Sequence, residues 1–331
     1  ACYGRGGASP TVTDADLVLG HLGADSFLGG NMTLDAEASR TAFASVAGPL
    51  GLTVEEAAWG VCQTVDETMA SAARLHISEK GADPSRLTVV AFGGAGPVHA
   101  IELARKLGCP TVLYPAHAGV MSSFGLLTAP PAFERLVSVK RLLGQIEPGF
   151  LRATVETLSK EVAEVMGEPV SAISFRFLAE MWHRGQEYPI EVEFSESDFD
   201  GDVAAALLER FTARYAELYG RTDDELPHEI SVIRAIGTSE HEGIASIGAD
   251  AGAPSTGASA TRLLFDAAQG ATVEVPIYMR ADLIVGQRFT GPAIIQDTDS
   301  AAVIRAGDEA TVLPTLAIEI RLAASIAGEA A

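Results

Sequence analysis

The longest regular pattern of apolar positions follows Thr53 and predicts a single long helix. Thr53 is a favourable N-cap, and Glu56 three residues later completes a capping box. Gly81 and Pro84 are typical of the end of such a helix. The apolar residues that recur at helical spacing, many of them small, predict one buried face: Ala57, Ala58, Val61, Val65, Met69 and Ala72.

The pattern then changes to that of a strand, a helix and a second strand. Residues 87–92 (LTVVAF) are almost wholly apolar, which is typical of a central strand buried on both faces. A glycine-rich turn, a helix that ends at Gly108 and a strand from Thr111 complete a βαβ unit. The two strands of such a unit are parallel, so this part of the chain predicts an α/β fold. A second loop rich in glycine and serine follows.

Beyond Pro130 and Pro131 the pattern is that of an α+β segment. Its predicted helices and strands, in chain order, are a helix at 150–166, two strands within 173–194, a helix at 202–220 and a strand at 228–238. In the second strand, Ile190, Val192 and Phe194 alternate with glutamates. One face of the predicted sheet should therefore contact water.

The rest of the chain predicts a linker and a small β-rich unit. Residues 241–265 are rich in Gly, Ala and Ser, which is typical of a mobile loop. Short apolar runs alternate with turns in residues 266–331, and the last nine residues are expected to be disordered. With the α/β segment at 1–135 and the α+β segment at 136–240, the chain is predicted to have four parts.

Charge and cysteine content limit the partners and the compartment. The formal net charge of −21 would repel nucleic acid and anionic membrane surfaces, so neither is expected as a partner. Cys2, Cys62 and Cys109 lie far apart and show no CxxC spacing, which indicates a reducing compartment and argues against disulfides or a zinc ribbon. The apolar runs are too short to span a membrane, and no secretory leader pattern precedes the first predicted helix. We therefore expect a cytoplasmic protein.

The glycine-rich turn after the first strand is a candidate binding site. We expect Gly96 at the N-cap of the next helix and Pro97 at its first position, after the small residues Gly93, Gly94 and Ala95. Such a turn lets a ligand approach the backbone, at the carboxyl end of a strand and at a helix N-terminus that favours negative charge. A turn that binds nothing fits the same residues.

Two known phosphate-binding fingerprints are absent. A dinucleotide-binding turn needs a third glycine where His99 stands and an acidic residue where Tyr114 stands. The chain also has no G-x-x-x-x-G-K-[S/T] string.

Seven sequence blocks, in order, carry a resemblance to a known family. They are ACYGRGGASPTVTDADLVLG, FLGGNMTLD, GADPSRLTVVAFGGAGPVHA, GVMSSFGLL, HRGQEYPIEV, ELYG and TGPAIIQDTDSAAVIRAG. The chain resembles the A-type subunit of the hydantoinase, 5-oxoprolinase and acetone or acetophenone carboxylase family. This resemblance implies the second half of an actin-like (ribonuclease H-like) ATPase core, then an α+β region and a small β-rich C-terminal unit.

The resemblance also implies ATP and Mg²⁺ as cofactors, a small-molecule substrate and a multi-chain complex. The D-x-G-G-T phosphate motifs of the family do not occur in this chain. We therefore expect them on a separate chain that corresponds to the N-terminal half of the A subunit, with a B-type subunit as a further partner. The implied reaction is ATP-dependent hydrolysis of a cyclic amide through phosphorylation of its carbonyl. An ATP-dependent ketone carboxylase, or a half-subunit without catalytic activity, are the alternatives.

Three residues near the start of the chain are candidate catalytic groups in this resemblance. Arg5, within a glycine-rich loop, would stabilise the transferring phosphoryl group or would pair with carboxylates as a structural arginine. Asp14 and Asp16 would approach Mg²⁺ or water, and Asp14 has an alternative role as a cap of the next helix. No residue of this chain is assigned as a direct metal ligand.

Further residues are candidates for lining the nucleotide or substrate cleft. Cys2 has no base beside it, so a packing thiol is the favoured alternative. His99, on the helix after the glycine turn, would contact ligand or form part of the structure. The full set of candidate lining residues is Cys2, Tyr3, Gly6, His99, Ser122 and Ser123.

Overall fold

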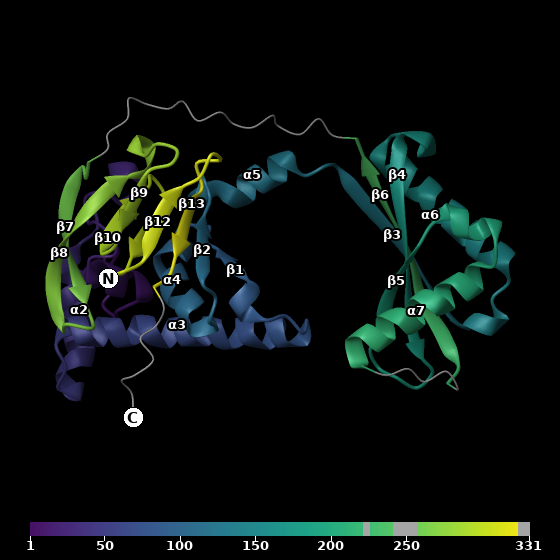
Figure 1. Cartoon of the computed structure of the whole chain (residues 1–331), viewed down its shortest axis with the longest axis horizontal. Helices are drawn as coiled ribbons and strands as arrows, with labels where there is room; N and C mark the ends of the chain where they lie inside the picture. The colour runs from purple at the N-terminus through teal and green to yellow at the C-terminus, as the bar shows by residue number, and fades with distance from the viewer. Residues whose placement is uncertain (221–225, 241–256, 324–331) are drawn as a thin grey trace. The chain divides into compact units, whose positions relative to one another are not determined.

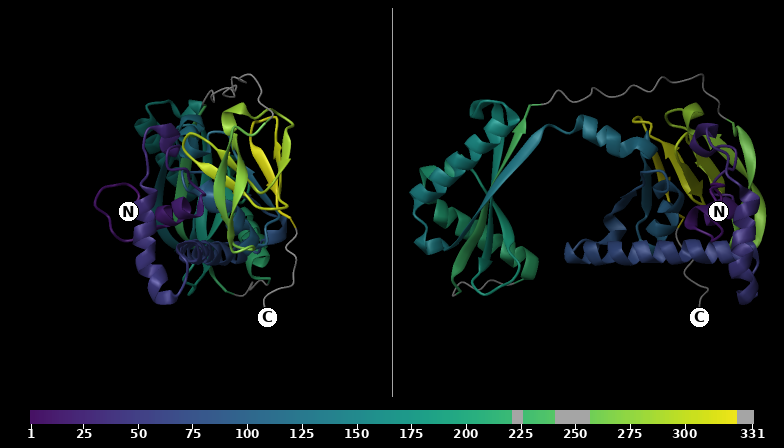
Figure 2. Two further views of the ribbon diagram at one scale, coloured as in Figure 1. Left: turned by 90° about the vertical axis from the view of Figure 1, so that its left-hand side faces the viewer. Right: turned by 180° about the vertical axis from the view of Figure 1, so that it is seen from behind.

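A computed structural model describes residues 1–220, 226–240 and 257–323. The chain forms two compact units, Ala1–Leu126 with Ile247–Ala331 (unit 1) and Leu127–Ser246 (unit 2), each described by itself (Figures 1 and 2). The two sheets of unit 1 are mixed, so the α/β expectation is confirmed at this level. Most of the predicted linker and nearly all of the predicted disordered end lie outside the described residues. No helix among the described residues is long and apolar enough to cross a membrane.

Unit 1 begins with three packed helices, α1 (Val12–Leu19), α2 (Ala36–Leu50) and α3 (Val54–Glu79). The predicted capping box at the start of α3 is confirmed, because the Thr53 hydroxyl accepts from the Glu56 N–H at 3.2 Å and the Glu56 carboxylate accepts in return. The predicted buried face is only partly right, since Ala72 is exposed. The most buried positions of α3 differ from the predicted ones and include Cys62 and Asp66, which the apolar pattern did not contain. These buried residues are Ala57, Ala58, Cys62, Asp66 and Ala70.

The predicted βαβ unit is confirmed as β1 (Thr88–Val90), α4 (Gly96–Leu107) and β2 (Thr111–Tyr114), with the two strands parallel. They belong to a five-stranded sheet in the order β1-β2-β13-β12-β9. The other three strands are β9 (Arg288–Thr290), β12 (Glu309–Val312) and β13 (Ile318–Arg321). The prediction of a central strand at 87–92 is wrong, because β1 lies at the edge of this sheet and Val90 is exposed.

A second sheet of unit 1 has the order β11-β10-β8-β7. Its strands are β7 (Ala260–Asp266), β8 (Ala271–Met279), β10 (Ala293–Gln296) and β11 (Ala301–Ile304). Every residue of β10 and β11 is buried, because alternate side chains join two apolar clusters that both include residues of α4. The strands expected to form a separate C-terminal unit therefore share cores and a sheet with the first part of the chain.

Unit 2 contains a four-stranded antiparallel sheet in the order β3-β6-β4-β5. Its strands are β3 (Ala132–Leu142), β4 (Ile173–His183), β5 (Ile190–Phe194) and β6 (His228–Ser239). Helices α6 (Pro148–Met166) and α7 (Val203–Tyr219) cover one face of it, and α5 (Met121–Thr128) precedes it in the chain (Figure 1). The predicted alternation in β5 is confirmed, since its three apolar residues are buried and its two glutamates are exposed.

Candidate functional site

The site is a cavity of about 250 Å³ in unit 1, at the start of α4. Three stretches that are far apart in the sequence line it. They are the N-terminal part of the chain from Tyr3 to Leu28, the turn and first residues of α4, and the loop from Gln296 to Ser300 between β10 and β11. The long-range pairing of these segments is set by α4, which packs against both sheets.

The glycine turn lies against this cavity as its residues require. Gly94 and Ala95 line it, while Gly93 has a left-handed φ of 89° and donates its N–H to the Ala118 carbonyl at 2.8 Å. The helix begins one residue earlier than expected, with Ala95 as N-cap and Gly96 as its first residue, and Pro97 remains within the first turn. A shift of one residue at a helix end is common, and it leaves Gly94 and Ala95 on the wall of the cavity.

The loop that follows β10 packs closely onto this turn. A Cβ atom added at Gly94 would lie 3.6 Å from the Asp299 carbonyl oxygen, which is an ordinary contact. A Cβ atom added at Gly119 would lie 2.4 Å from the Asp299 Cβ atom, a distance that forces a shift. Glycine is thus needed at 119 to let the loop reach the cavity, and the loop in turn places Asp299 and Ser300 on its wall.

Behind the cavity, a buried histidine joins two carboxylates. The His99 Nδ1 atom lies 2.9 Å from Asp66 Oδ1, and its Nε2 atom lies 3.4 Å from Asp16 Oδ2. Burial alone would lower the pKa of His99, but the hydrogen bonds to Asp16 and Asp66 outweigh it and raise the pKa to about 10. Burial would raise the pKa of Asp16, and its bonds to His21 and His99 instead lower it to about 2. An imidazolium therefore lies between two carboxylates, and Asp16 also lines the cavity.

A second histidine extends this network away from the cavity. His21 Nδ1 lies 3.0 Å from Asp16 Oδ1, and its Nε2 lies 3.4 Å from an Arg305 guanidinium nitrogen. Burial lowers the pKa of His21, so the ring is neutral. Because arginine only donates, Nε2 accepts from Arg305 and Nδ1 carries the proton that it donates to Asp16. Arg305 is also paired with Glu102 at 2.8 Å.

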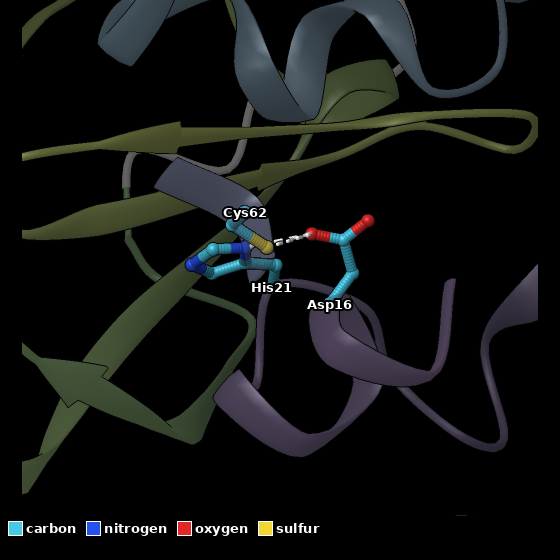
Figure 3. Close-up of side chains that lie close together, drawn as sticks. All are labelled: Asp16, His21 and Cys62. Carbon is cyan, nitrogen blue, oxygen red and sulfur yellow. Dashed lines mark hydrogen bonds and ion pairs between the residues drawn. The ribbon is translucent and has the colours of Figure 1, made fainter. Parts of the chain in front are cut away.

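Asp16, His21 and Cys62 bring one possible ligand atom each to within 4.8 Å of one another (Figure 3). Hydrogen bonds account for this cluster, since the Cys62 thiol lies 3.7 Å from Asp16 Oδ1. A cation on His21 Nδ1 would require the proton on Nε2, where Arg305 offers only donors. Burial and the adjacent carboxylates raise the pKa of the Cys62 thiol, so the thiol keeps its proton in this cluster. The three residues therefore fit a proton-sharing cluster better than a metal site.

Asp14 is fully buried and caps α1, which was the alternative to a catalytic role. Its carboxylate accepts from the Cys2 N–H at 2.7 Å, the Thr11 N–H at 2.9 Å and the Ser39 hydroxyl at 2.7 Å. Burial would raise its pKa, but the hydrogen bonds from Ser39 and Thr11 hold the pKa below the usual range. Both oxygens are thus occupied by donors of the protein.

The remaining predicted residues divide between the cavity and other places. Tyr3 lines the cavity and packs edge-on against Phe27. Cys2 is buried, and burial together with the nearby Asp14 raises the pKa of its thiol to about 11, as fits a packing thiol. Arg5 and Gly6 are exposed and do not line it, and the same is true of Ser122 and Ser123 at the start of α5.

Sequence reasoning missed the groups contributed by distant segments. Gln296 Oε1 accepts from the Ser26 hydroxyl at 3.3 Å and from Arg262 at 3.1 Å, and the Tyr114 hydroxyl lies 2.6 Å from that of Ser300. Gln296 to Ser300 lie within the last of the quoted sequence blocks, between two apolar runs. Their chemistry was visible, but no local pattern shows that they face residues 270 positions away.

Comparison with known proteins places this unit in a family. Residues 1–135 match the Hydantoinase/oxoprolinase family model. The caprolactamase alpha subunit of Pseudomonas jessenii is 29% identical over 96% of the chain and 47% of its own length. The acetone carboxylase beta subunit of Xanthobacter autotrophicus is 29% identical over 90% of the chain and 44% of its own. The Arabidopsis thaliana 5-oxoprolinase 1 is 30% identical over 92% of the chain and 25% of its own length.

Two solved structures show the same relationship. A crystal structure of the ATP-dependent caprolactamase of Pseudomonas jessenii has a TM-score of 0.78 at 27% identity, and a nucleotide-free acetone carboxylase has 0.74 at 27%. In each case the aligned region covers 97% of this chain and 48% of the chain in the solved structure. The chain belongs to the hydantoinase/oxoprolinase family, and it spans less than half the length of these relatives.

Proposed function

We propose that this chain is part of an ATP-dependent enzyme that opens a cyclic amide. The observation that carries the proposal is the match to the ATP-dependent caprolactamase, which extends over 97% of the chain and includes the cavity at the glycine turn. Cyclic amides resist hydrolysis because resonance stabilises the carbonyl. Transfer of a phosphoryl group from ATP to the carbonyl oxygen makes the carbon open to attack by water. The ring C–N bond then breaks with the protonated amine as the leaving group, and hydrolysis of the resulting acyl phosphate releases phosphate.

In this proposal the glycine turn holds part of the nucleotide. Gly94 and Ala95 present backbone to the cavity, and the first turn of α4 favours negative charge beside it. The remaining turn residues Gly93, Gly96 and Pro97 fix the path of the backbone. Actin-like architecture and an adenosine-side role for this turn remain part of the proposal.

The cavity has two carboxylates, one fixed by hydrogen bonds within the protein and one exposed. Asp16 is fixed by His21 and His99, so its charge is constant near neutral pH and it would orient a donor of the ligand or a water. Asp299 lies exposed on the wall of the cavity, and its oxygens fit the hard ligands that Mg²⁺ prefers. When bound, MgATP would supply the phosphoryl group. Asp14 does not fit such a role because donors of the protein occupy both of its oxygens.

Other polypeptides would complete the site. The relatives are named as alpha, beta and gamma subunits, and this chain covers less than half of the first ones. We propose that a chain equivalent to the N-terminal half of the A subunit supplies the D-x-G-G-T phosphate motifs, and that a B-type subunit joins the complex. Arg5, in an exposed loop, would act only once that surface is covered, and the same holds for Gly6, Ser122 and Ser123 as cleft residues.

A ketone carboxylase is the second candidate, favoured by the acetone carboxylase structure at a TM-score of 0.74. Both reactions use an activated carbonyl, so the substrate decides between them. The assembled complex should hydrolyse ATP in response to caprolactam, 5-oxoproline or hydantoin if the first proposal holds. A response only to acetone or acetophenone with bicarbonate would replace it with the second, and absence of nucleotide binding would leave a role without catalysis.

Gly94→Val tests the placement of the nucleotide. The branched side chain would enter the space between the turn and Asp299 and should weaken ATP binding by about tenfold, as expected for the loss of one close contact. The matched control is Gly144→Val in unit 2, an exposed position where an added Cβ meets nothing within 4 Å. Calorimetric titration of the assembled complex measures both variants. Equal affinities for ATP in the two variants would mean that the turn does not contact the nucleotide.

A further inference from the structure

A second cavity lies in unit 1, at the Arg305 end of the histidine network. Its volume is about 270 Å³, and α3, the later turns of α4, the turn between β7 and β8 and the residues after β11 all contribute to it. Leu264 and Val273 on its wall belong to the same apolar cluster as Val98, which lines the cavity at the glycine turn. The two cavities are therefore connected both by this cluster and by the histidine network. The side chains of the second cavity used below are Trp59, Glu102, Arg105, Leu264, Asp266, Val273 and Arg305.

The charged groups of the second cavity keep free hydrogen-bonding positions. Glu102 Oε1 accepts from Arg305 Nε at 2.8 Å, while Glu102 Oε2 has no donor among the described residues. The Arg305 guanidinium also reaches His21 through Nη2 at 3.4 Å and lies over the Trp59 ring. Its Nη1 atom has no acceptor in the described part of the chain, so it can donate to a ligand.

This mixture of charges fits a ligand that has one negative and one positive group. A simple anion would meet the carboxylates of Glu102 and Asp266, and a simple cation would meet two guanidinium groups, so like charges disfavour both. A carboxylate can accept from Arg305 or Arg105 while an ammonium group donates to Glu102.

The size and the apolar wall of the cavity limit the ligand further. Leu264 and Val273 offer an apolar surface for a hydrocarbon chain between the two charged groups. At the volume that a water molecule takes in the liquid, 270 Å³ holds about nine non-hydrogen atoms. The ligand class is therefore a small amino acid with a short apolar chain.

We propose that the second cavity binds such a zwitterion and that the bound carboxylate draws Arg305 away from His21. The carboxylate is the stronger competitor, because a hydrogen bond between two charged groups is stronger than one to a neutral imidazole. His21 Nε2 then loses the donor that fixes its tautomer. Because His21 holds Asp16, which lines the cavity at the glycine turn, an occupant of the second cavity loosens a residue of the first.

The opening of a cyclic amide yields a molecule of this class. The ring nitrogen becomes an amine and the carbonyl becomes a carboxylate, so product bound in the second cavity would act on the site that made it. This connection rests on the proposed function, whereas zwitterion binding and the release of His21 do not.

A fluorescence titration of the full chain tests the site. In a Trp182→Phe background, Trp59 on the wall of the second cavity is the only indole. The probes are 6-aminohexanoate and two molecules of the same chain length that lack one charge each, hexanoate and hexylamine. The zwitterion should change the Trp59 emission saturably. Each of the other probes should bind at least about tenfold more weakly, as expected when one charge-assisted hydrogen bond is lost.

Glu102→Gln separates the contributions of the two charges. It removes the acceptor of the ammonium group and frees Arg305 from its carboxylate partner. The variant should therefore bind 6-aminohexanoate about tenfold more weakly and hexanoate more tightly than the parent chain. Glu309→Gln is the matched control, because Glu309 is an exposed glutamate of unit 1 that does not line this cavity. Circular dichroism checks that both variants are folded.

Nitrogen NMR of the His21 ring measures the second half of the proposal. The Nε2 resonance should shift as 6-aminohexanoate saturates the chain, because its donor is withdrawn. Absence of a saturable change in Trp59 emission, or equal binding of the three probes, overturns the site. Saturable binding with an unchanged Nε2 resonance overturns the link to His21. Neither measurement needs ATP or activity, so these failures are distinct from failure of the proposed function, which is measured by ATP hydrolysis in the assembled complex.

Discussion

Replacing His99 by glutamine removes the only positive charge between Asp16 and Asp66 within the described network. The imidazole is 7% exposed and both carboxyl partners are also buried. Removing one member of a buried ion pair leaves an uncompensated charge and costs about 3–5 kcal/mol of unfolding free energy. We expect His99→Gln to lose that amount. Asp66→Asn should restore part of it in the same chain, because one stranded carboxylate is then neutral.

Urea unfolding with a probe confined to unit 1 measures this loss. The chain has two tryptophans, Trp59 and Trp182, so a Trp182→Phe background leaves Trp59 on α3 as the only indole. Arg305 lies over the Trp59 ring at 5.0 Å, which places the reporter beside the network. A double-mutant cycle of His99→Gln and Asp66→Asn should give a coupling of about 2 kcal/mol.

The pH dependence supplies an independent readout of the same charge. The pKa of His99 is about 10 in the folded chain and about 6.5 when unfolded, so between these values the folded state binds one more proton. Stability from this group is complete below pH 6.5 and falls by about 1.4 kcal/mol per pH unit as the pH rises toward 10. The wild-type chain should show this slope between pH 7 and 7.5, below most of the ionisation of unfolded thiols, whose pKa is about 8.5, and His99→Gln should show a much smaller one. A cost below about 1 kcal/mol for His99→Gln, with parallel pH curves, would refute the imidazolium.

Two further predictions concern the cavity wall and the thiols. Gly119→Ala places a Cβ atom 2.4 Å from the Asp299 Cβ atom, so it should displace the 296–300 loop and weaken nucleotide binding by about tenfold, unlike Gly144→Ala. Unchanged affinity in calorimetry would show that the loop does not contact the nucleotide. Cys2, Cys62 and Cys109 are buried with raised pKa values, so a disulfide reagent should modify them only at the rate of unfolding. Rapid labelling of the native chain would contradict this.

Local rules in the sequence were sufficient for the elements but not for their partners. The Thr53 capping box and the parallel β1–α4–β2 unit follow from interactions within a few residues or from one connection. The buried stripe of α3 was misplaced because Asp66 counts as polar in any pattern. It is buried here since His99, 33 positions later, neutralises it.

The candidate site was predicted only where its residues carry a local signature. The glycine turn was visible because small residues followed an apolar strand, and Asp16 was proposed for its chemistry. The polar residues of the loop at 296–300 are visible in the sequence, but their position in the fold is not. That position depends on how β10 and β11 pack against α4. The apolar run at 87–92 was read as central, and the sheet places it at an edge instead.

The division of unit 1 into two stretches of sequence sets an order of events during synthesis. Residues 127–246 are made after α4 but before β13, so a ribosome completes unit 2 while β2 still lacks its antiparallel neighbour. The cavity cannot close until Gln296 to Ser300 have emerged, because they form one of its walls. Closing this long connection adds only a logarithmic entropy cost. A nascent chain stalled before β10 would thus contain the whole sequence of unit 2 and an α4 whose preceding glycine turn is still open to water.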